Sequence, residues 1–223
     1  MKIINDYYKS GKIKLVRHSI NNKLYREDGP ARVEYYENGN VKSEQYLIDG
    51  AFHREHGPAI TQYYENGNVQ AETYLIHHDY HRTDGPAWIE YYINGKVKIE
   101  IYYINDCIYR ESKPSIIRYY DNGSIKCEKY CYDNKYHRED GPAVVEYCMN
   151  GEIQSEQYFI NDEVVNIERY SGIDKDKLLE LIDNADNVNL LLRLKLILST
   201  IYKQYETELL ELIESKITML KLL

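Results

Sequence analysis

A His-Arg-x-Asp segment carries the residue types best suited to chemistry in this sequence. His81-Arg82-Thr83-Asp84 and His137-Arg138-Glu139-Asp140 place an aspartate close behind a His-Arg pair, as in the catalytic loop of protein kinases, where the aspartate is the base. An active site is built once, whereas this segment occurs five times, starting at Tyr25, His53, His81, Tyr109 and His137. We therefore predict no catalytic residue and no enzyme activity. Each arginine instead packs on a neighbouring tyrosine and pairs with an acidic group such as Asp28, Asp84 or Asp140, tying one turn to the next.

Histidines and cysteines are the other candidate ligands. His77, His78 and His81 cluster in one loop without acidic or thiol partners at a diagnostic spacing, so we predict no metal site there, nor at His53 and His56. The four cysteines fit neither a paired CxxC zinc pattern nor a dense disulfide scaffold, and we expect reduced, mostly buried thiols: Cys107, Cys127, Cys131 and Cys148. No cofactor is predicted.

The elements that position these residues form an internal repeat of 28 residues. Three residue types mark the same places in five consecutive units, and we assign the arginines and glycines a structural role in the repeat. The arginines are Arg26, Arg54, Arg82, Arg110 and Arg138; the glycines are Gly39, Gly67, Gly95, Gly123 and Gly151; the prolines are Pro30, Pro58, Pro86, Pro114 and Pro142. Tyr7-Tyr8 and Gly11 continue the register backwards, so a partial unit opens the chain.

Each unit reads as a β-hairpin followed by a short extended piece, such as Phe52-His53-Arg54. The Asn66-Gly67 pair predicts a type I′ turn, and alternating residues such as Ala59, Thr61 and Tyr63 predict a half-buried strand. A second row of aromatic side chains projects to the opposite face. It is either a partner-contact surface or cross-strand packing within the sheet: Tyr36, Tyr64, Trp88, Tyr92 and Tyr120.

The fourth unit departs from the pattern. Ser112-Lys113-Pro114-Ser115 replaces the Asp-Gly-Pro-Ala of the first, third and fifth units. The lost glycine changes the turn, which motivates the hypothesis of a kink or binding position at residues 111–115, against neutral drift in a tolerant loop.

A unit of this size cannot bury a core alone, so neighbouring units must pair edge to edge. We predict a mainly β fold, an elongated antiparallel β-hairpin array over residues 1–170 with units starting near 24, 52, 80, 108 and 136. Residues 171–223 lack proline and are rich in Leu and Ile, which predicts helices at about 174–183, 187–202 and 203–221. A strand at Leu192–Leu196 is the local alternative. These helices either cap the last strand or pair with another copy as a homo-oligomer, and we favour capping.

The YYxNGxxxxExY block resembles MORN-type repeats over residues 7 to about 163, especially the variant of bacterial antitoxin-like proteins and of giant-virus repeat proteins. The units here are longer than typical MORN units by the HREDGPA segment at 137–143. The resemblance implies a non-enzymatic hairpin array for protein or membrane-surface contact, with no catalytic residues.

Charge sets the expected partners. Lys and Arg number 28 against 36 Asp and Glu, a net charge of -8, which argues against nucleic acid. We predict a scaffold for protein–protein interaction, with a partner of unknown identity. The alternatives are a MORN-type membrane-surface adaptor, disfavoured by the acidic balance, and an antitoxin-like inhibitor of a partner protein. Residues 1–10 lack the apolar core of a secretory signal. We expect a cytoplasmic protein, in the host cytoplasm or virion if the Tyr-, Ile-, Asn- and Lys-rich composition reflects a giant virus.

Overall fold

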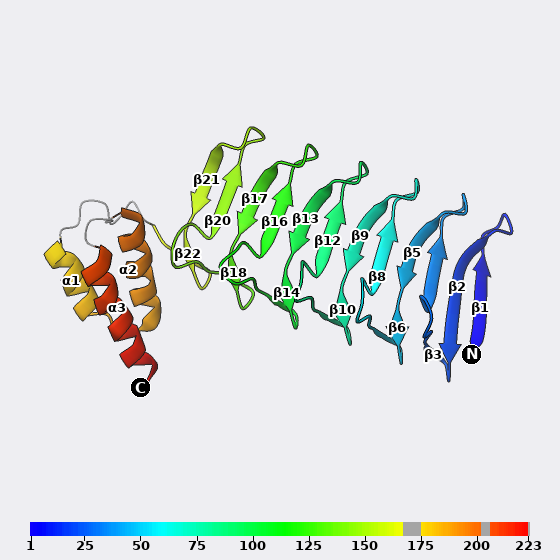
Figure 1. The fold of residues 1–223 in the computed structure, drawn as a ribbon, viewed down its shortest axis with the longest axis horizontal. Coiled ribbons are helices and arrows are strands. Elements are labelled where there is room, and N and C mark those ends of the chain that lie inside the picture. The colour runs from blue at the N-terminus through cyan, green and yellow to red at the C-terminus, as the bar shows by residue number, and fades with distance from the viewer. Residues whose placement is uncertain (167–174, 202–205, 223) are drawn as a thin grey trace.

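Twelve long strands form one antiparallel sheet in the computed structural model, which describes residues 1–166, 175–201 and 206–222. Each strand pairs with the next long strand of the chain, which makes a row of six hairpins (Figure 1). The predicted antiparallel hairpin array is thereby confirmed. In sheet order the strands are β1 (Lys2–Tyr7), β2 (Ile13–Ile20), β4 (Arg32–Tyr35), β5 (Val41–Gln45), β8 (Ile60–Tyr63), β9 (Val69–Thr73), β12 (Trp88–Tyr91), β13 (Val97–Ile101), β16 (Ile116–Tyr119), β17 (Ile125–Lys129), β20 (Val144–Tyr147) and β21 (Ile153–Gln157).

A second, smaller hairpin follows each long one. The sequence predicted only a short extended piece at Phe52-His53-Arg54 and missed this hairpin. Phe52 ends its return strand and pairs with Leu47. In the first unit the end of β2 pairs with β3 (Lys23–Leu24) in the same way. The others are β6 (Leu47–Ile48) with β7 (Ala51–Phe52), β10 (Leu75–Ile76) with β11 (Asp79–Tyr80), β14 (Tyr103–Ile104) with β15 (Cys107–Ile108), β18 (Cys131–Tyr132) with β19 (Lys135–Tyr136), and β22 (Phe159–Ile160) with β23 (Glu163–Val164).

The two hairpin types use different turns. In the long hairpin Gly67 has φ +89, and its N–H bonds to the Tyr64 carbonyl at 2.9 Å, while Asn66 has no positive φ. This is a turn closed by a left-handed glycine, so the predicted type I′ geometry at Asn-Gly is wrong. The paired positive φ angles that a type I′ turn needs occur instead in the small hairpins, as at Asn105 (φ 50) and Asp106 (φ 63).

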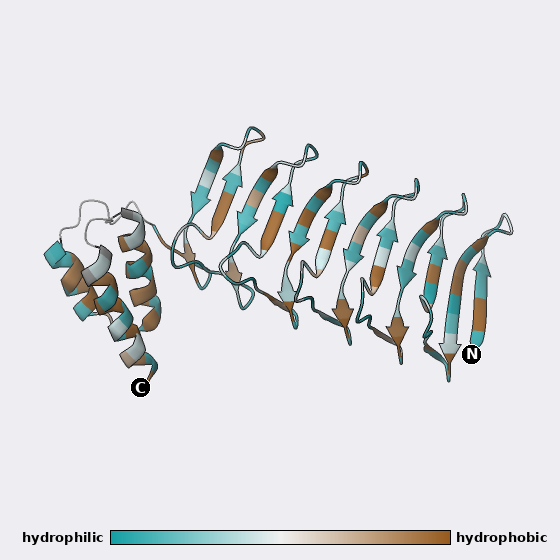
Figure 2. Cartoon of the chain, in the orientation of Figure 1, coloured by the Kyte–Doolittle hydropathy of each residue, from teal (hydrophilic) through white to brown (hydrophobic). Residues whose placement is uncertain are grey.

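The buried residues of the array are small and repeat from unit to unit. Ala59 and Ala87 have no exposed surface, and Ser115 is equally buried at the same place in the fourth unit. The Ser115 hydroxyl there accepts a hydrogen bond from the Cys131 N–H at 2.9 Å. Apolar residues recur at the same level of successive hairpins (Figure 2), as the period-two pattern predicts.

Backbone hydrogen bonds join each unit to the next outside the long-strand ladders. The Tyr46 N–H bonds to the Ala59 carbonyl at 2.8 Å, and the Tyr74 N–H bonds to Ala87 at 2.7 Å. A second set links the small hairpins, where the His78 N–H donates to the Phe52 carbonyl at 2.9 Å. Both ends of a unit therefore depend on its neighbour for their polar backbone groups.

Three helices follow the array: α1 (Lys175–Asp183), α2 (Val188–Ile201) and α3 (Glu206–Lys221). The three predicted helices are confirmed; residue 174 of the first, residue 202 of the second and residues 203–205 of the third lie outside the described residues, as does the predicted boundary between residues 170 and 171. A helix occupies Leu192–Leu196, so the alternative of a strand there is wrong. Asn187 caps α2 by accepting a hydrogen bond from the Leu190 N–H at 2.9 Å.

The helices cap the array through the last small hairpin. Ile160, fully buried, and Val165 join one apolar cluster with helical residues such as Leu191, Leu194 and Ile213. Most residues of strand β21 are exposed to solvent. The predicted cap is therefore confirmed, whereas its expected placement over the last long strand is wrong, because the apolar surface that the helices need belongs to β22 and not to the polar edge strand.

Ion pairs fix the cap to the fifth unit. The Lys195 ammonium lies 3.0 Å from the Glu139 carboxylate and 3.3 Å from Glu214, and Arg193 pairs with Glu163. The His137 hydrogen bond and the Lys195 ion pair hold the pKa of Glu139 down at about 2 against the opposing effect of burial.

We expect the contact between cap and array to weaken in acid. The folded pKa of Glu139 lies below its ordinary value, so its contribution to stability is complete above pH ~4.5 and is lost as the pH falls toward ~2. Glu139→Gln should lower the unfolding midpoint of the cap at pH 7 and flatten its decline between these pH values, measured by helical circular dichroism. Glu152→Gln, at an exposed turn, is the control. A Glu139→Gln profile parallel to that of the unmodified protein would contradict this role.

Candidate functional site

A stack of arginine on tyrosine recurs along the array and is its most regular polar feature. Each guanidinium lies over the ring of a tyrosine eight residues earlier, in the preceding unit. The distances from Cζ to the ring centroid are 3.8 Å for Arg54 on Tyr46, 4.0 Å for Arg82 on Tyr74, 3.8 Å for Arg110 on Tyr102 and 3.9 Å for Arg138 on Tyr130. In the first unit His18 stands at the tyrosine position. Such contacts are worth about 0.5–1 kcal/mol at exposed sites, and they fix the plane of the guanidinium.

A second contact fixes the edge of each stacked guanidinium. Nη1 donates to the carbonyl of the proline four residues later, at 3.2 Å for Arg54 and Arg138 and 3.3 Å for Arg82 and Arg110. The predicted packing of arginine on tyrosine is confirmed. The expected link between units is present in this stack, because each tyrosine belongs to the unit before that of its arginine, whereas the proline contact stays within one loop. The main chain of the same loop bonds to the small hairpin at the end of its unit, at 3.1 Å from the Arg54 N–H to the Leu75 carbonyl.

Three of the five arginines also hold a carboxylate on the remaining edge. The distance from Nε to Oδ1 is 2.8 Å in the Arg26–Asp28 pair and 2.7 Å in the Arg82–Asp84 and Arg138–Asp140 pairs. The hydrogen bond from the arginine lowers the pKa of Asp28 and of Asp84. The predicted pairing with these three aspartates is confirmed.

The second and fourth units lack this carboxylate. His56 and Ser112 occupy the aspartate position, and Arg54 and Arg110 form no ion pair within the described residues. Both arginines keep the tyrosine stack and the proline hydrogen bond. Two guanidiniums of the array thus present an unpaired Nε edge in a fixed orientation.

The loop of the fourth unit differs from its sisters, as the sequence hypothesis for residues 111–115 requires. A Cβ added at Gly85 would lie 2.8 Å from Cζ of Arg82, so a side chain has no room at this place in the common loop. In the fourth unit Lys113 stands there, and Ser112 takes φ +53. The lysine therefore forces a different turn, with a backbone angle that costs a non-glycine residue about 1 kcal/mol or more.

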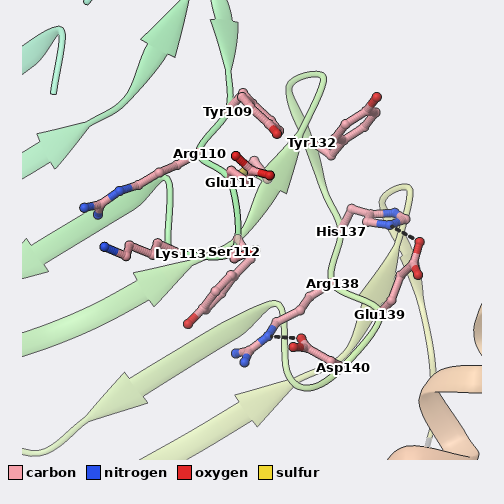
Figure 3. A pocket seen from close by; sticks show the side chains of 12 residues that line it. Tyr109, Arg110, Glu111, Ser112, Lys113, Tyr132, His137, Arg138, Glu139 and Asp140 are labelled. Atoms are coloured by element: carbon pink, nitrogen blue, oxygen red, sulfur yellow. Dashed lines mark hydrogen bonds and ion pairs between the residues drawn. The ribbon is translucent and has the colours of Figure 1, made fainter. Parts of the chain in front are cut away.

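Successive loops enclose a row of open cavities, which we call the notches and name by their two arginines. Their volumes are about 570 Å³ for Arg26/Arg54, 440 Å³ for Arg54/Arg82, 290 Å³ for Arg82/Arg110 and 310 Å³ for Arg110/Arg138. In the last notch (Figure 3) the side chains of Arg110 and Lys113 point to one side of their loop, and the Glu111 carboxylate lies on the side of Tyr109. Each notch is thus lined by aromatic rings and by arginine side chains whose orientation is fixed.

The five aromatic residues predicted as partner contacts lie elsewhere. The hydroxyls of four of them donate to a backbone carbonyl of the next unit, at 2.8 Å for Tyr36, Tyr64 and Tyr92 and 2.9 Å for Tyr120. Trp88 is half-buried with its ring 6.5 Å from that of Tyr80. The four tyrosine hydroxyls join neighbouring units, and a role of the five aromatic residues in partner contact stays a prediction.

Histidines and cysteines occupy structural positions. The rings of His53 and His77 lie 4.3 Å apart, and His81 bonds to Asn105 at 2.7 Å. In the part of the chain that the structure describes, no group of three or more histidine, cysteine or acidic residues is arranged to hold a metal. All four cysteines are free thiols.

Sequence reasoning missed the side-chain bonds of the small hairpins. The second turn residue of one small hairpin accepts a hydrogen bond from a backbone N–H of the preceding small hairpin, at 2.7 Å for Asp106 with Tyr80 and for Asp162 with Tyr136. The signal was the polar pair that recurs after each short apolar run, as in Asn105-Asp106 and Asn161-Asp162. Such pairs favour the two positive φ angles found there.

The geometry defines a class of protein, a repeat array of β-hairpins. Comparison with family models finds the MORN repeat variant three times, at residues 31–49, 60–77 and 87–105. Each match covers one long hairpin and the outgoing strand of the small hairpin that follows it. The protein is a MORN-like repeat protein, and MORN repeats are a non-enzymatic, scaffolding type of module.

The search of curated proteins returned no match. Within the described residues, every helix is too short or too polar to traverse a lipid bilayer.

We expect the array to lose stability in alkali through a second row of tyrosines. The Tyr63 hydroxyl donates to Glu44 and the Tyr91 hydroxyl to Glu72, both at 2.7 Å across a unit boundary. Burial and the carboxylate raise the pKa of Tyr63 to about 12 and also raise that of Tyr91. A raised phenol pKa stabilises the fold below pH ~10, and this contribution is lost as the pH rises toward ~12.

Tyr91→Phe should therefore destabilise the protein by about 1–2 kcal/mol at neutral pH and reduce the alkaline loss, measured by denaturant unfolding across this range. Tyr7→Phe is the matched control, because Tyr7 holds the same repeat position but is 57% exposed. Equal effects of the two substitutions would refute the proposed unit-to-unit bond.

Proposed function

We propose that the protein is a scaffold that binds a protein partner along the notches. The observation that carries the proposal is the repetition of one lining, two arginines and the tyrosine on which the second of them stacks, at four successive places along one sheet. A ligand that uses several notches must be long and must follow the array. An extended segment of another protein fits this shape.

The chemistry of the notches suits a protein better than a lipid surface. Aromatic faces and arginines are enriched at protein interfaces. A membrane adaptor needs a basic stripe, whereas Glu27, Asp28, Glu55 and Glu111 line the notches beside the arginines. Free thiols at all four cysteines support the cytoplasmic setting that we include in the proposal, with the host cytoplasm or virion as its viral form.

Site-directed crosslinking tests the proposal. A photo-crosslinking residue in place of Glu111, which lines two notches, should capture one discrete protein in extracts of the native cell. The control replaces Ile93, which is 61% exposed at the tip of a long hairpin, and should capture nothing comparable. Flotation with anionic vesicles is run in parallel. Capture from both positions alike, or flotation with vesicles that abolishes capture at Glu111, would overturn the proposal.

A further inference from the structure

Three units of the array show which ligand the stacked arginine accepts. In each of them a carboxylate lies on the Nε edge of the guanidinium at 2.7–2.8 Å, and in the third and fifth units the face of the guanidinium lies on a tyrosine. The aspartate comes from the same loop, two residues after the arginine. The array therefore contains its own examples of a bound carboxylate.

The second and fourth units repeat this geometry without the carboxylate. Arg54 and Arg110 stack at 3.8 Å on their tyrosines and bond to their proline carbonyls, as Arg82 and Arg138 do. Their Nε edge is held in the orientation that accepts Asp84 or Asp140 in the neighbouring units. An arginine fixed in this way loses little side-chain entropy when a carboxylate binds.

The fourth unit adds a second cation. Lys113 lines the same notch as Arg110, and its side chain points to the same side of the loop in Figure 3. The nearest acidic residue in the sequence, Glu111, forms no ion pair with either cation within the described residues. The positive charge of this notch is therefore not cancelled within its own loop.

We propose that Arg54 and Arg110, the latter with Lys113, bind two carboxylates of an acidic segment in the partner protein. This inference rests on the proposed function and names the chemistry of the partner. The two arginines are two units apart, four strand spacings of about 4.8 Å, or roughly 19 Å. An extended peptide advances about 3.3 Å per residue, so the two acidic side chains should lie about six positions apart.

The alternation of units selects this ligand over a uniform polyanion. Arg26, Arg82 and Arg138 already carry aspartates, so every second loop presents a carboxylate to a ligand that follows the array. A nucleic-acid backbone would place phosphates against these aspartates, which costs affinity through like-charge repulsion. A peptide with acidic residues only at the matching spacing avoids that repulsion.

Fluorescence anisotropy with a labelled peptide tests the proposal on the full-length protein. The probe carries two glutamates six positions apart in an otherwise neutral sequence; the comparison peptides place them three apart or replace both by glutamine. We expect the six-residue spacing to bind about tenfold more tightly than either comparison peptide, with affinity falling as salt rises.

Placing an aspartate two residues after Arg54 or Arg110 restores the carboxylate that the sister units carry. Such variants are expected to fold, because the sister units already have this loop. His56→Asp and the double change Ser112→Asp with Lys113→Gly recreate the loop sequence of the sister units, and each should weaken peptide binding about tenfold. Asp84→Ser makes the reverse change, because it removes the internal carboxylate from Arg82. Arg82 lies one unit from Arg54 and from Arg110, so this variant should bind the peptide with glutamates three apart more strongly. Lys42→Gln, which removes a half-exposed cation that is in the lining of none of the four notches, should leave binding of the six-residue probe unchanged.

Binding that ignores glutamate spacing, or that survives both restored loops, would overturn the proposal. Preferential binding of inorganic phosphate or single-stranded DNA over the peptide would overturn it as well. Crosslinking from Glu111 separates this failure from that of the scaffold function: capture of a partner that persists in the restored-loop variants keeps the scaffold and removes the arginine sites.

Discussion

The rest of the structure depends on one constraint: a hairpin unit of this length leaves its polar groups unsatisfied until a neighbour supplies the partners. Backbone donors such as the Tyr46 N–H find their acceptor in the following unit. The hydroxyl of Tyr64 and the carboxylate of Glu72 each find their partner across the same boundary. Because these bonds repeat at every boundary, the units set one another's register and order.

The C-terminal end of the array shows how this constraint is relaxed where a further unit is missing. Cys148 stands where Tyr120 and its equivalents donate to the next unit, so the fifth unit presents no hydroxyl for a further unit. Its small hairpin buries Ile160 against the helices. The helical cap thus replaces, with apolar contacts and ion pairs, the bonds that another unit would have made.

The sequence supports prediction of the repeat, the hairpins and the helices because each rests on periodic signals. It does not determine the turns so directly. Asn66-Gly67 carries the usual type I′ signal, yet a bulge between Gln62 and Tyr63 shifts the register so that only Gly67 has a positive φ. The small hairpins escaped prediction because strands of two residues show no alternation. The notches depend on loops brought together by the sheet, and only the five arginines hinted at them.

The fourth unit illustrates where a broken pattern has structural meaning. Losing a glycine is a visible change in sequence, but its effect becomes clear only from the place of Gly85 against Arg82 in the sister loop. Lys113 cannot occupy that place, so the turn changes and Arg110 keeps its stack without a carboxylate. Irregular units of a regular array are therefore the first places to look for specificity.

The most direct test of mutual stabilisation is native-state hydrogen exchange in a variant whose core is truncated in one central unit. Ile89, 7% exposed in the third long hairpin after the opening one, packs within the shared inner row; Ile89→Ala should cost about 2–4 kcal/mol. If units stabilise one another, protection falls in both flanking hairpins, β8–β9 and β16–β17, as well as in β12–β13. Loss of protection confined to β12–β13 would contradict the account.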